Sequence, residues 1–416
     1  MLNKSYKKTC KVCLYDESHP LGIIINEQGI CSGCLIHKEK DIIDWEERFN
    51  SLEKNIKEYR SNSSTNYDCI VPVSGSGQSF YILHLLKEKL KLNPLLVSYN
   101  HYFNTKIGIR NLSNLRTVFD SDILIQNINI QSVKKIIKTT FRELNSIYWH
   151  VIAGQTAFPV QIAITNKIPL IIWGAHQGIE QVGMFSHFDE VEMTRRYRKE
   201  HDLMGYEADD LLSKFDILKE EDIWRYRYPD ELDISNIGVK GIYLGNYFRW
   251  DPKIQHEFVI KNYNYKTLNH ERTFYSYDHV DCFNYMNLHD ILKFIKHGFS
   301  KVTDHACREI RHGRLKRKEA EKIVSYYQGV KPKYLNLFCN WLGINEVALN
   351  QLLINIYNDI NYKKNIKNRV RNIDDIFKND KNSEKKEKYK KDNFINSSEI
   401  VLNENDEYIL FGKEYP

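Results

Sequence analysis

The chain has 416 residues, of which 42% are hydrophobic, 12% aromatic and 27% charged, a composition that excludes a disordered or fibrous protein. Its 60 Lys and Arg residues against 54 Asp and Glu residues give a net charge of +6, too small for a broad nucleic-acid-binding surface. No apolar run reaches the roughly 20 residues of a membrane span. We therefore expect a cytoplasmic protein of two or three domains, with neither nucleic acid nor membrane among its partners.

The N-terminal segment contains two CxxC pairs, Cys10/Cys13 and Cys31/Cys34. Two such pairs at this separation are typical of a closed four-cysteine zinc site, and in a reducing compartment metal binding is favoured over a disulfide. The alternative is four unrelated thiols. We predict a structural zinc knuckle with a linker helix, together residues 1–60.

Short apolar runs then alternate with helical patterns. Such alternation predicts a doubly wound parallel α/β sheet, and we place this domain at residues 67–285. The expected strands are 69–73, 95–99, 122–127 and 169–173, with a return to the sheet at 241–248, and the expected helices include 107–119 and 149–166.

The remaining chain divides by composition. A charged, helical stretch at 178–233 is too long for a simple connection, so we expect an insertion over the carboxyl edge of the sheet. Helical periodicity predicts a helical subdomain at 286–357. Residues 358–416 are rich in Lys, Asn and Asp and are expected to be a flexible tail, although the apolar run at 407–411 can dock as a strand.

A Ser/Gly loop follows the first expected strand, with the sequence Ser74-Gly-Ser-Gly-Gln-Ser79. Its main-chain N–H groups and hydroxyls can converge on a phosphate, and Gly75 and Gly77 allow close approach. There is no Gly-Lys-Ser/Thr here, so a Walker loop is excluded. The alternative is an ordinary strand-to-helix turn in which Ser79 is the N-cap.

The stretch from Asp68 through this loop resembles the pyrophosphate-loop (PP-loop) ATPases, in the adenine nucleotide alpha hydrolase-like (HUP-like) superfamily. A closer resemblance is to the N-acetyl sugar amidotransferases of bacterial surface-polysaccharide (lipopolysaccharide) biosynthesis, and covers roughly residues 8–350. It rests on the cysteine pairs and on the segments 103–112, 193–197, 243–250, 303–306 and 309–314.

This resemblance implies ATP- and Mg-dependent activation of an acetamido group on a sugar or nucleotide sugar. Ammonia from partner glutaminase and cyclase-like subunits would then convert that group to an acetamidino group. The chain departs from the family twice: Gln78 stands where the loop has aspartate, and Ala175 stands where an acidic residue follows Trp-Gly. A carboxylate is the ligand that Mg²⁺ prefers, so the alternative is a catalytically impaired paralogue, a binding subunit of a glutaminase complex.

The resemblance also implies roles for individual residues. The loop residues Ser74, Gly75, Ser76, Gly77 and Ser79 would hold the pyrophosphate, with Ser98, Asn104 and Gly174 near the nucleotide. For Ser98 and Asn104 the alternative is a local hydrogen bond to the backbone.

Three arginines and one His/Asp pair remain as candidates, while the catalytic residues stay unassigned. Arg308, Arg311 and Arg314 recur every three residues, so on one helix they share a face that could bind substrate phosphates or could simply be solvated. His305 and Asp304 could form an acid–base pair, or a cap or core hydrogen bond.

A third functional reading comes from two further cysteines, Cys282 and Cys307. The tRNA-thiolation enzymes among the PP-loop ATPases use cysteines to carry sulfur. The spacing does not pair these two residues, and free buried cysteines are commonly inert.

Overall fold

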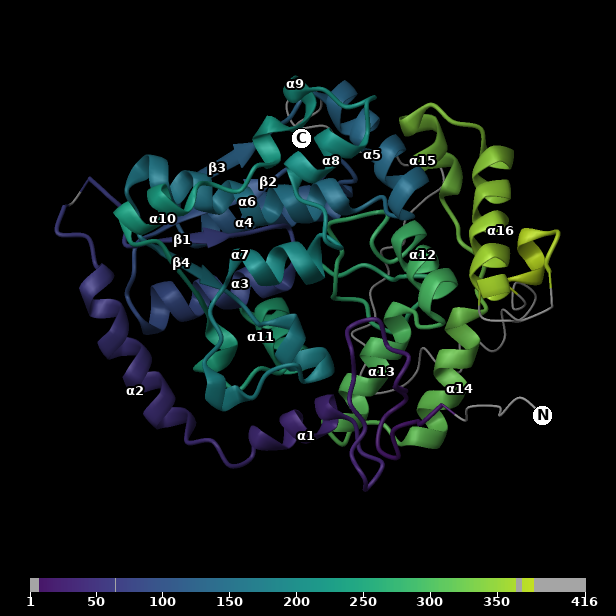
Figure 1. The fold of residues 1–416 in the computed structure, drawn as a ribbon. Helices are drawn as coiled ribbons and strands as arrows, with labels where there is room; N and C mark the ends of the chain where they lie inside the picture. Colours follow the sequence, from purple (N-terminus) through teal and green to yellow (C-terminus); the bar gives the residue numbers. More distant parts are fainter. Residues whose placement is uncertain (1–6, 64, 364–368, 378–416) are drawn as a thin grey trace.

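The structure, a computed structural model, describes residues 7–63, 65–363 and 369–377. Within them the chain forms a sheet covered by helices on both faces, flanked by a helical region and by the cysteine-containing N-terminal segment (Figure 1). The expected strand at 407–411 lies outside the described residues.

Within the described residues, five parallel strands form the sheet, in the order β3-β2-β1-β4-β5. The strands are β1 (Cys69–Pro72), β2 (Pro94–Tyr99), β3 (Ile123–Gln126), β4 (Leu170–Trp173) and β5 (Lys240–Tyr243). The register pairs Ile70 of β1 with Leu95 of β2 and with Ile171 of β4. This sheet confirms the predicted doubly wound α/β fold, and each strand lies where the sequence predicts one.

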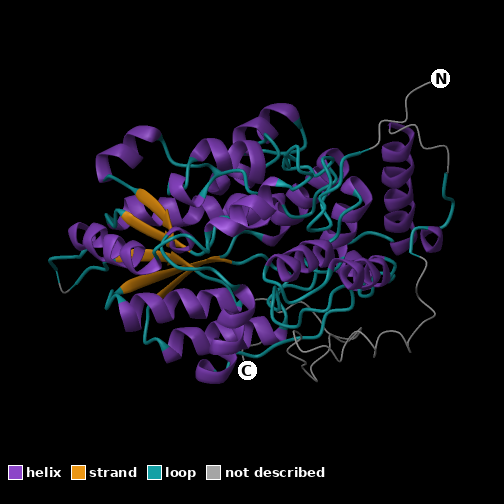
Figure 2. Cartoon of the chain, turned by 90° about the horizontal axis from the view of Figure 1, so that it is seen from below, coloured by secondary structure: helices purple, strands orange, loops and turns teal. Residues whose placement is uncertain are grey.

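The helices of the α/β domain cover opposite faces of this sheet (Figure 2). They are α3 (Gly77–Leu83), α4 (Lys106–Val118), α5 (Ile130–Leu144), α6 (Trp149–Asn166) and α11 (Pro252–Tyr263). One apolar core joins α3, α4 and α11 to one face through residues such as Phe80, Leu96 and Leu115, and another joins α6 to the opposite face through Ile70 and Val160. Burial on both faces explains why the strands are continuous apolar runs.

The charged segment after β4 differs from the expected insertion. It contains α7 (Arg195–Tyr197), α8 (Ala208–Lys214), α9 (Glu220–Ile223) and α10 (Glu231–Ile237). Contacts of α9 with α5 and of α10 with α6 place this part on the outer helices. Its first turn, a π-helical segment at Gly178–Val182, instead contacts the N-terminal helix α1 (Ser32–Glu39).

The C-terminal helices share a core with the α/β domain. They are α12 (Leu288–His297), α13 (Lys301–Arg311), α14 (Arg317–Gln328), α15 (Leu335–Leu342) and α16 (Glu346–Lys363). The buried residues of α12, α15 and α16 form one apolar cluster with Ile136 of α5 and Trp149 of α6, whereas those of α13 and α14 join the core that contains α3, α4 and α11. Helix α16 runs past the predicted start of the flexible tail, and Phe377 is also buried in this cluster.

The N-terminal segment leads through α1 into a second helix, α2 (Trp45–Ile56). Asp44 caps α2, because its carboxylate accepts hydrogen bonds from the N–H groups of Glu46 and Glu47. Leu52 and Ile56 bury the apolar face of α2 in the core of the α/β domain. Across the described part of the chain, no helix is both long and apolar enough to cross a membrane.

Candidate functional site

Strands β1 and β4 lie side by side, and the connection order of the sheet reverses between them. In doubly wound sheets ligands bind in the crevice at the carboxyl ends of such strands. The loop from Ser74 follows β1 and Gly174 follows β4, so both sequence-predicted segments lie at this point.

Hydrogen bonds within the Ser/Gly loop fix its conformation. The Oγ of Ser79 accepts a bond from the N–H of Ser74 at 3.1 Å, and the Oγ of Ser74 accepts one from the N–H of Ser76 at 3.3 Å. Helix α3 begins at Gly77 with Ser76 as its N-cap. The reading of Ser79 as an N-cap is therefore wrong: its hydroxyl closes the loop instead.

The two loop glycines are required by packing against the protein. A Cβ at Gly75 would lie 2.2 Å from the carbonyl oxygen of Gly108 on α4, and a Cβ at Gly77 would lie 2.4 Å from the ring of His256 on α11. Any larger residue would push these segments apart. The sequence predicts that Gly75 and Gly77 allow a close approach to the loop. In the structure the groups that approach these glycines are helices α4 and α11.

A narrow cavity opens beside this loop. Its walls include Gln78, Ala175, Glu180, Trp250, Arg308 and Arg311. The loop, the segment after β4, the start of α11 and helix α13 therefore meet here. Both departures from the family pattern, Gln78 and Ala175, face the same cavity.

The three arginines do not share one face. Helix α13 ends at Arg311, so Arg314 lies beyond it, where it pairs with Asp251 at 2.7 Å and Glu309 at 2.6 Å. Arg308 and Arg311 line the cavity, and Arg311 donates to the carbonyls of Glu180 and Gln181. The structure thus brings two of the three arginines to the site.

His305 and Asp304 are not an acid–base pair, because their side chains have different partners. Asp304 accepts hydrogen bonds from Tyr15, at 2.7 Å, and from Lys293. Although burial raises the pKa of Asp304, the Lys293 ammonium lowers it below the ordinary value. The Nδ1 of His305 contacts the Thr273 hydroxyl at 2.7 Å, and burial lowers the pKa of this imidazole well below its usual value.

A buried carboxylate that sequence reasoning missed lies next to the cavity. Asp278 accepts a hydrogen bond from Arg308 at 3.1 Å, and its oxygens lie 3.7 Å from His305 and 3.9 Å from His256. Burial raises the pKa of Asp278, but the nearby Arg308 guanidinium lowers it to below its ordinary value. Two aspartates three residues apart, Asp278 and Asp281, in a tyrosine-rich segment were the available signal.

The remaining nucleotide candidates are separate from this cavity or only border it. Ser98 is buried in β2, and the Nδ2 of Asn104 donates to the Oδ1 of Asn100 at 2.8 Å; neither lines the cavity. The Gly174 carbonyl accepts the N–H of Gly245 at 3.0 Å, and a Cβ at Gly174 would lie 3.3 Å from Trp250. Of these three, only Gly174 lies against a cavity wall.

The four cysteines of the N-terminal segment converge. Their Sγ atoms all lie within 4.8 Å of one another, with 3.5 Å between Cys13 and Cys31 and 4.0 Å between Cys10 and Cys34. A tetrahedral zinc with four ligands at about 2.3 Å separates its sulfurs by about 3.8 Å, so these thiols fit the ion. A zinc held here would fold a segment too small for its own core.

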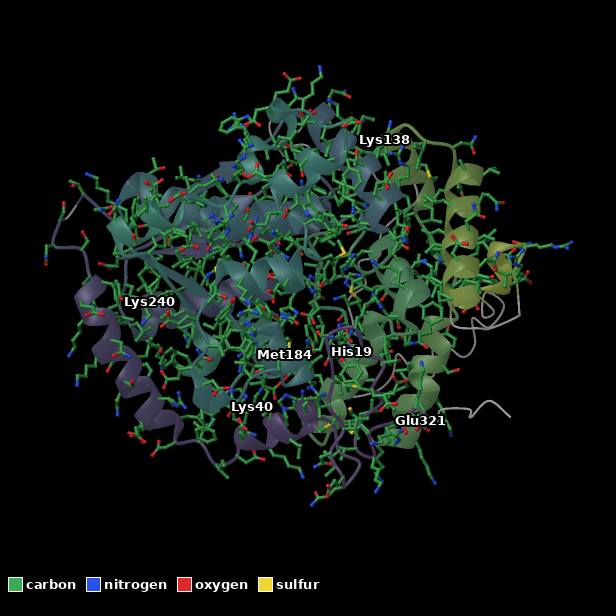
Figure 3. All side chains as sticks on the ribbon, viewed as in Figure 1. His19, Lys40, Lys138, Met184, Lys240 and Glu321 are labelled. Carbon is green, nitrogen blue, oxygen red and sulfur yellow. The ribbon has the colours of Figure 1, made fainter. Side chains whose placement is uncertain are left out.

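This cysteine cluster packs directly against the site. The Nη2 of Arg311 lies 3.8 Å from the Sγ of Cys31, so a single side chain touches both the cysteine cluster and the cavity. Met184, in the chain after β4, packs on the cysteine cluster; Figure 3 labels this residue together with His19 and Lys40 of the N-terminal segment.

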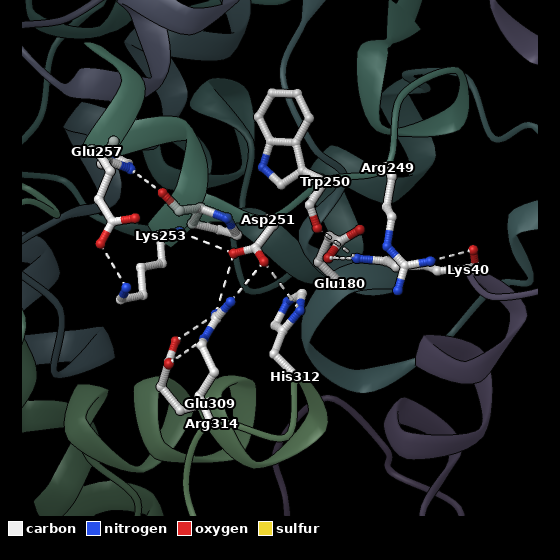
Figure 4. A network of polar contacts seen from close by, with 12 residues as sticks. Lys40, Glu180, Arg249, Trp250, Asp251, Lys253, Glu257, Glu309, His312 and Arg314 are labelled. Atoms are coloured by element: carbon white, nitrogen blue, oxygen red, sulfur yellow. Dashed lines mark hydrogen bonds and ion pairs between the residues drawn. The ribbon is translucent and has the colours of Figure 1, made fainter. Parts of the chain in front are cut away.

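A network of polar contacts at this junction includes two residues of the cavity wall, Glu180 and Trp250 (Figure 4). The Lys40 ammonium donates to the Oε2 of Glu180 at 2.6 Å and to the carbonyl of Trp250 at 3.0 Å. Arg249 bonds Asp41 at 2.6 Å. The end of α1 therefore fixes two cavity residues, Glu180 and Trp250.

Cys282 and Cys307 lie in different cores. The Sγ of Cys282 accepts the Tyr148 hydroxyl at 2.8 Å, and that of Cys307 accepts the N–H of Leu14 at 3.4 Å. Both thiols are buried, an arrangement that offers no route for sulfur transfer between them.

Two structural comparisons accompany this geometry. An NH3-dependent NAD synthetase of Campylobacter jejuni, solved with nitrate, is 16% identical with a TM-score of 0.27, covering 47% of this chain and 92% of its own. An NMN synthetase of Francisella tularensis is 12% identical with a TM-score of 0.25, covering 52% of this chain and 94% of its own.

Two sequence comparisons also give matches. An uncharacterized protein of Methanocaldococcus jannaschii is 32% identical over 123 residues, 28% of this chain, and the chain matches 42% of that relative's length. Residues 271–396 match the family described as LPS biosynthesis protein WbpG-like, C-terminal domain. This match confirms the resemblance to surface-polysaccharide biosynthesis proteins, and it includes Asp278, Arg308 and Arg311. Residues 271–396 of this chain are thus similar to the WbpG-like C-terminal domain family of LPS biosynthesis proteins.

Proposed function

We propose that the protein is an N-acetyl sugar amidotransferase of surface-polysaccharide biosynthesis, acting in the cytoplasm. The observation that carries this proposal is that the WbpG-like region supplies Arg308 and Arg311 to the cavity beside the Ser/Gly loop. A domain of an LPS biosynthesis family and a PP-loop-type segment therefore build one site.

In the proposed reaction, the acetamido oxygen attacks the α-phosphorus of ATP and pyrophosphate leaves. Ammonia then attacks the imidate carbon, the C–O bond to AMP breaks, and AMP leaves with the electron pair. One proton passes to solvent and an amidinium remains. ATP with Mg²⁺ would supply the leaving group, and Ser74, Ser76 and Ser79 would contact its phosphates while Arg308 offers positive charge.

The site in its described form is closed around the loop, and the cavity has the room of about one water-sized group. ATP binding therefore requires the segments around the loop to move apart. Partner glutaminase and cyclase-like subunits would deliver ammonia, and free ammonium should replace them in an assay.

The test incubates the full chain with ATP, Mg²⁺, ammonium and a panel of UDP- and CMP-linked acetamido sugars. We expect AMP and pyrophosphate in equal amounts, and a product in which NH replaces one oxygen by mass spectrometry. Omission of ammonium should abolish the product. If no sugar in the panel yields AMP, the proposal is wrong.

A second candidate is a binding subunit that keeps the fold without the reaction. It is favoured by one observation: Gln78 and Ala175, at the two positions without a carboxylate, both face the cavity. Binding of an acetamido sugar without ATP turnover, even after glutaminase and cyclase-like partners are added, would support this alternative.

A further inference from the structure

Three residues of the cavity wall carry buried polar atoms without a hydrogen-bond partner among the described residues. These atoms are the Oε1 of Glu180, the Nε1 of Trp250 and the Nε of Arg311. Such atoms are rare in proteins, because an unpaired buried polar group costs about 1–3 kcal/mol. Three of them around one cavity indicate a site built for a polar ligand.

The neighbours of these atoms hold them in place. Lys40 binds both the Oε2 of Glu180 and the carbonyl of Trp250. Arg311 donates through Nη1 to the carbonyl of Glu180 at 3.1 Å. All three side chains are therefore fixed by contacts through their other polar atoms or main chain, and only the unpaired atoms remain to bind a ligand.

The hydrogen-bonding capacity of the set favours a ligand group that both accepts and donates hydrogen bonds. The indole N–H of Trp250 and the Nε–H of Arg311 are donors, and the Oε1 of Glu180 is an acceptor. A secondary amide is complementary, because its oxygen accepts two hydrogen bonds and its N–H donates one. An ionised carboxylate or phosphodiester has no proton for Glu180, and a simple cation has no acceptor for the two donors.

We propose that Trp250, Arg311 and Glu180 form the binding site for the acetamido group of the sugar, next to Gln78 of the phosphate loop. This inference deepens the proposed function, on which it rests for the identity of the sugar class. The amide oxygen, which is the nucleophile toward ATP, would be held between Trp250 and Arg311 beside the loop that contacts the phosphates. Because the described cavity has room for about one water-sized group, the acetamido group, like ATP, enters when the segments around the loop move apart.

The test measures binding without ATP, by calorimetry on the full chain. The probes are UDP-N-acetylglucosamine and UDP-N-acetylgalactosamine, each compared with UDP-glucose or UDP-galactose, which lack the amide. We expect the acetamido member of at least one pair to bind at least tenfold tighter. Trp250→Phe, which keeps an aromatic ring but removes the N–H, should reduce that ratio at least fivefold.

A matched control is Trp224→Phe, because Trp224 is 48% exposed on the surface and its loss should leave the ratio unchanged. If Trp250→Phe does not fold, Glu180→Gln provides the second test, with the same expected loss of selectivity. Equal binding of both members of every pair by the natural chain would overturn the site. A preference for the amide that survives both Trp250→Phe and Glu180→Gln would also overturn it.

The outcomes separate this site from the proposed reaction. Amide-selective binding that depends on Trp250, without AMP release under any condition, would support the site and contradict the amidotransferase reaction. AMP release with selectivity that is independent of Trp250 and Glu180 would support the reaction and overturn the site.

Discussion

Replacement of the buried Asp278 by asparagine tests whether this carboxylate balances the charge beside the cavity. The Asp278 side chain is 6% exposed and pairs with Arg308, whose side chain is 26% exposed. Burial lowers the pKa values of His256 and His305, so both imidazoles are neutral at pH 7.5 and Arg308 is the main cation facing Asp278. Asparagine keeps the shape of the side chain and removes its charge.

The magnitude follows from the burial of the pair. Breaking a fully buried ion pair costs about 3–5 kcal/mol, because the remaining charge is left unpaired in the interior. Solvent reaches part of the Arg308 side chain, so we expect Asp278→Asn to reduce the free energy of unfolding by about 2–3 kcal/mol. The free energy is measured by urea denaturation at pH 7.5, followed by circular dichroism and fluorescence together.

Two variants make this measurement specific. Glu192→Gln breaks an ion pair with Lys240 in which both side chains are more than 40% exposed, and should cost at most about 1 kcal/mol. The double variant Asp278→Asn with Arg308→Met removes both charges and should recover part of the lost stability. A loss below about 1 kcal/mol for Asp278→Asn would refute the charge-balance reasoning.

Three further predictions concern metal, pH and the loop. Purified protein should contain about one zinc per chain by elemental analysis; Cys13→Ser should lose most of it, whereas Cys307→Ser should retain it. Burial raises the pKa of Asp202 to about 7, so the folded chain keeps a proton there that the unfolded chain releases above pH 4. Stability should fall as pH rises from 4 to 7, and Asp202→Asn should remove up to about 4 kcal/mol of that loss in urea titrations. Gln78→Asp should raise Mg²⁺-dependent ATP affinity in calorimetry, and unchanged affinity would contradict the proposed role of the loop.

The sequence predicts the sheet well, for a physical reason. Parallel strands buried on both faces must be continuous apolar runs, so Cys69–Pro72 and Leu170–Trp173 are conspicuous without any knowledge of their partners. The convergence of the four cysteines is predicted equally well, because two CxxC pairs at this separation have the spacing of a four-cysteine metal site.

Other features depend on contacts distant in sequence and escape such reasoning. The arginine spacing suggests one helix face, but the helix ends at Arg311, and Gly313, with a φ of 71°, turns the chain so that Arg314 points to other partners. Asp278 lies outside the helices and strands of the structure, and its environment comes from α11 and α13. No local pattern carries that information.

The two departures from the family pattern acquire a common physical meaning from their shared cavity. Its carboxylates are already paired, Glu180 with Lys40 and Asp304 with Lys293, and two arginines lie in the same walls. Such a cavity offers little free negative charge, so Mg²⁺ would have to bind mainly through the phosphates of the nucleotide. A new carboxylate at position 78 would also face Arg308, which is now held by Asp278. The gain in Mg²⁺ affinity from Gln78→Asp should therefore be larger when Arg308 is replaced by methionine, because the new carboxylate then faces one competing cation fewer.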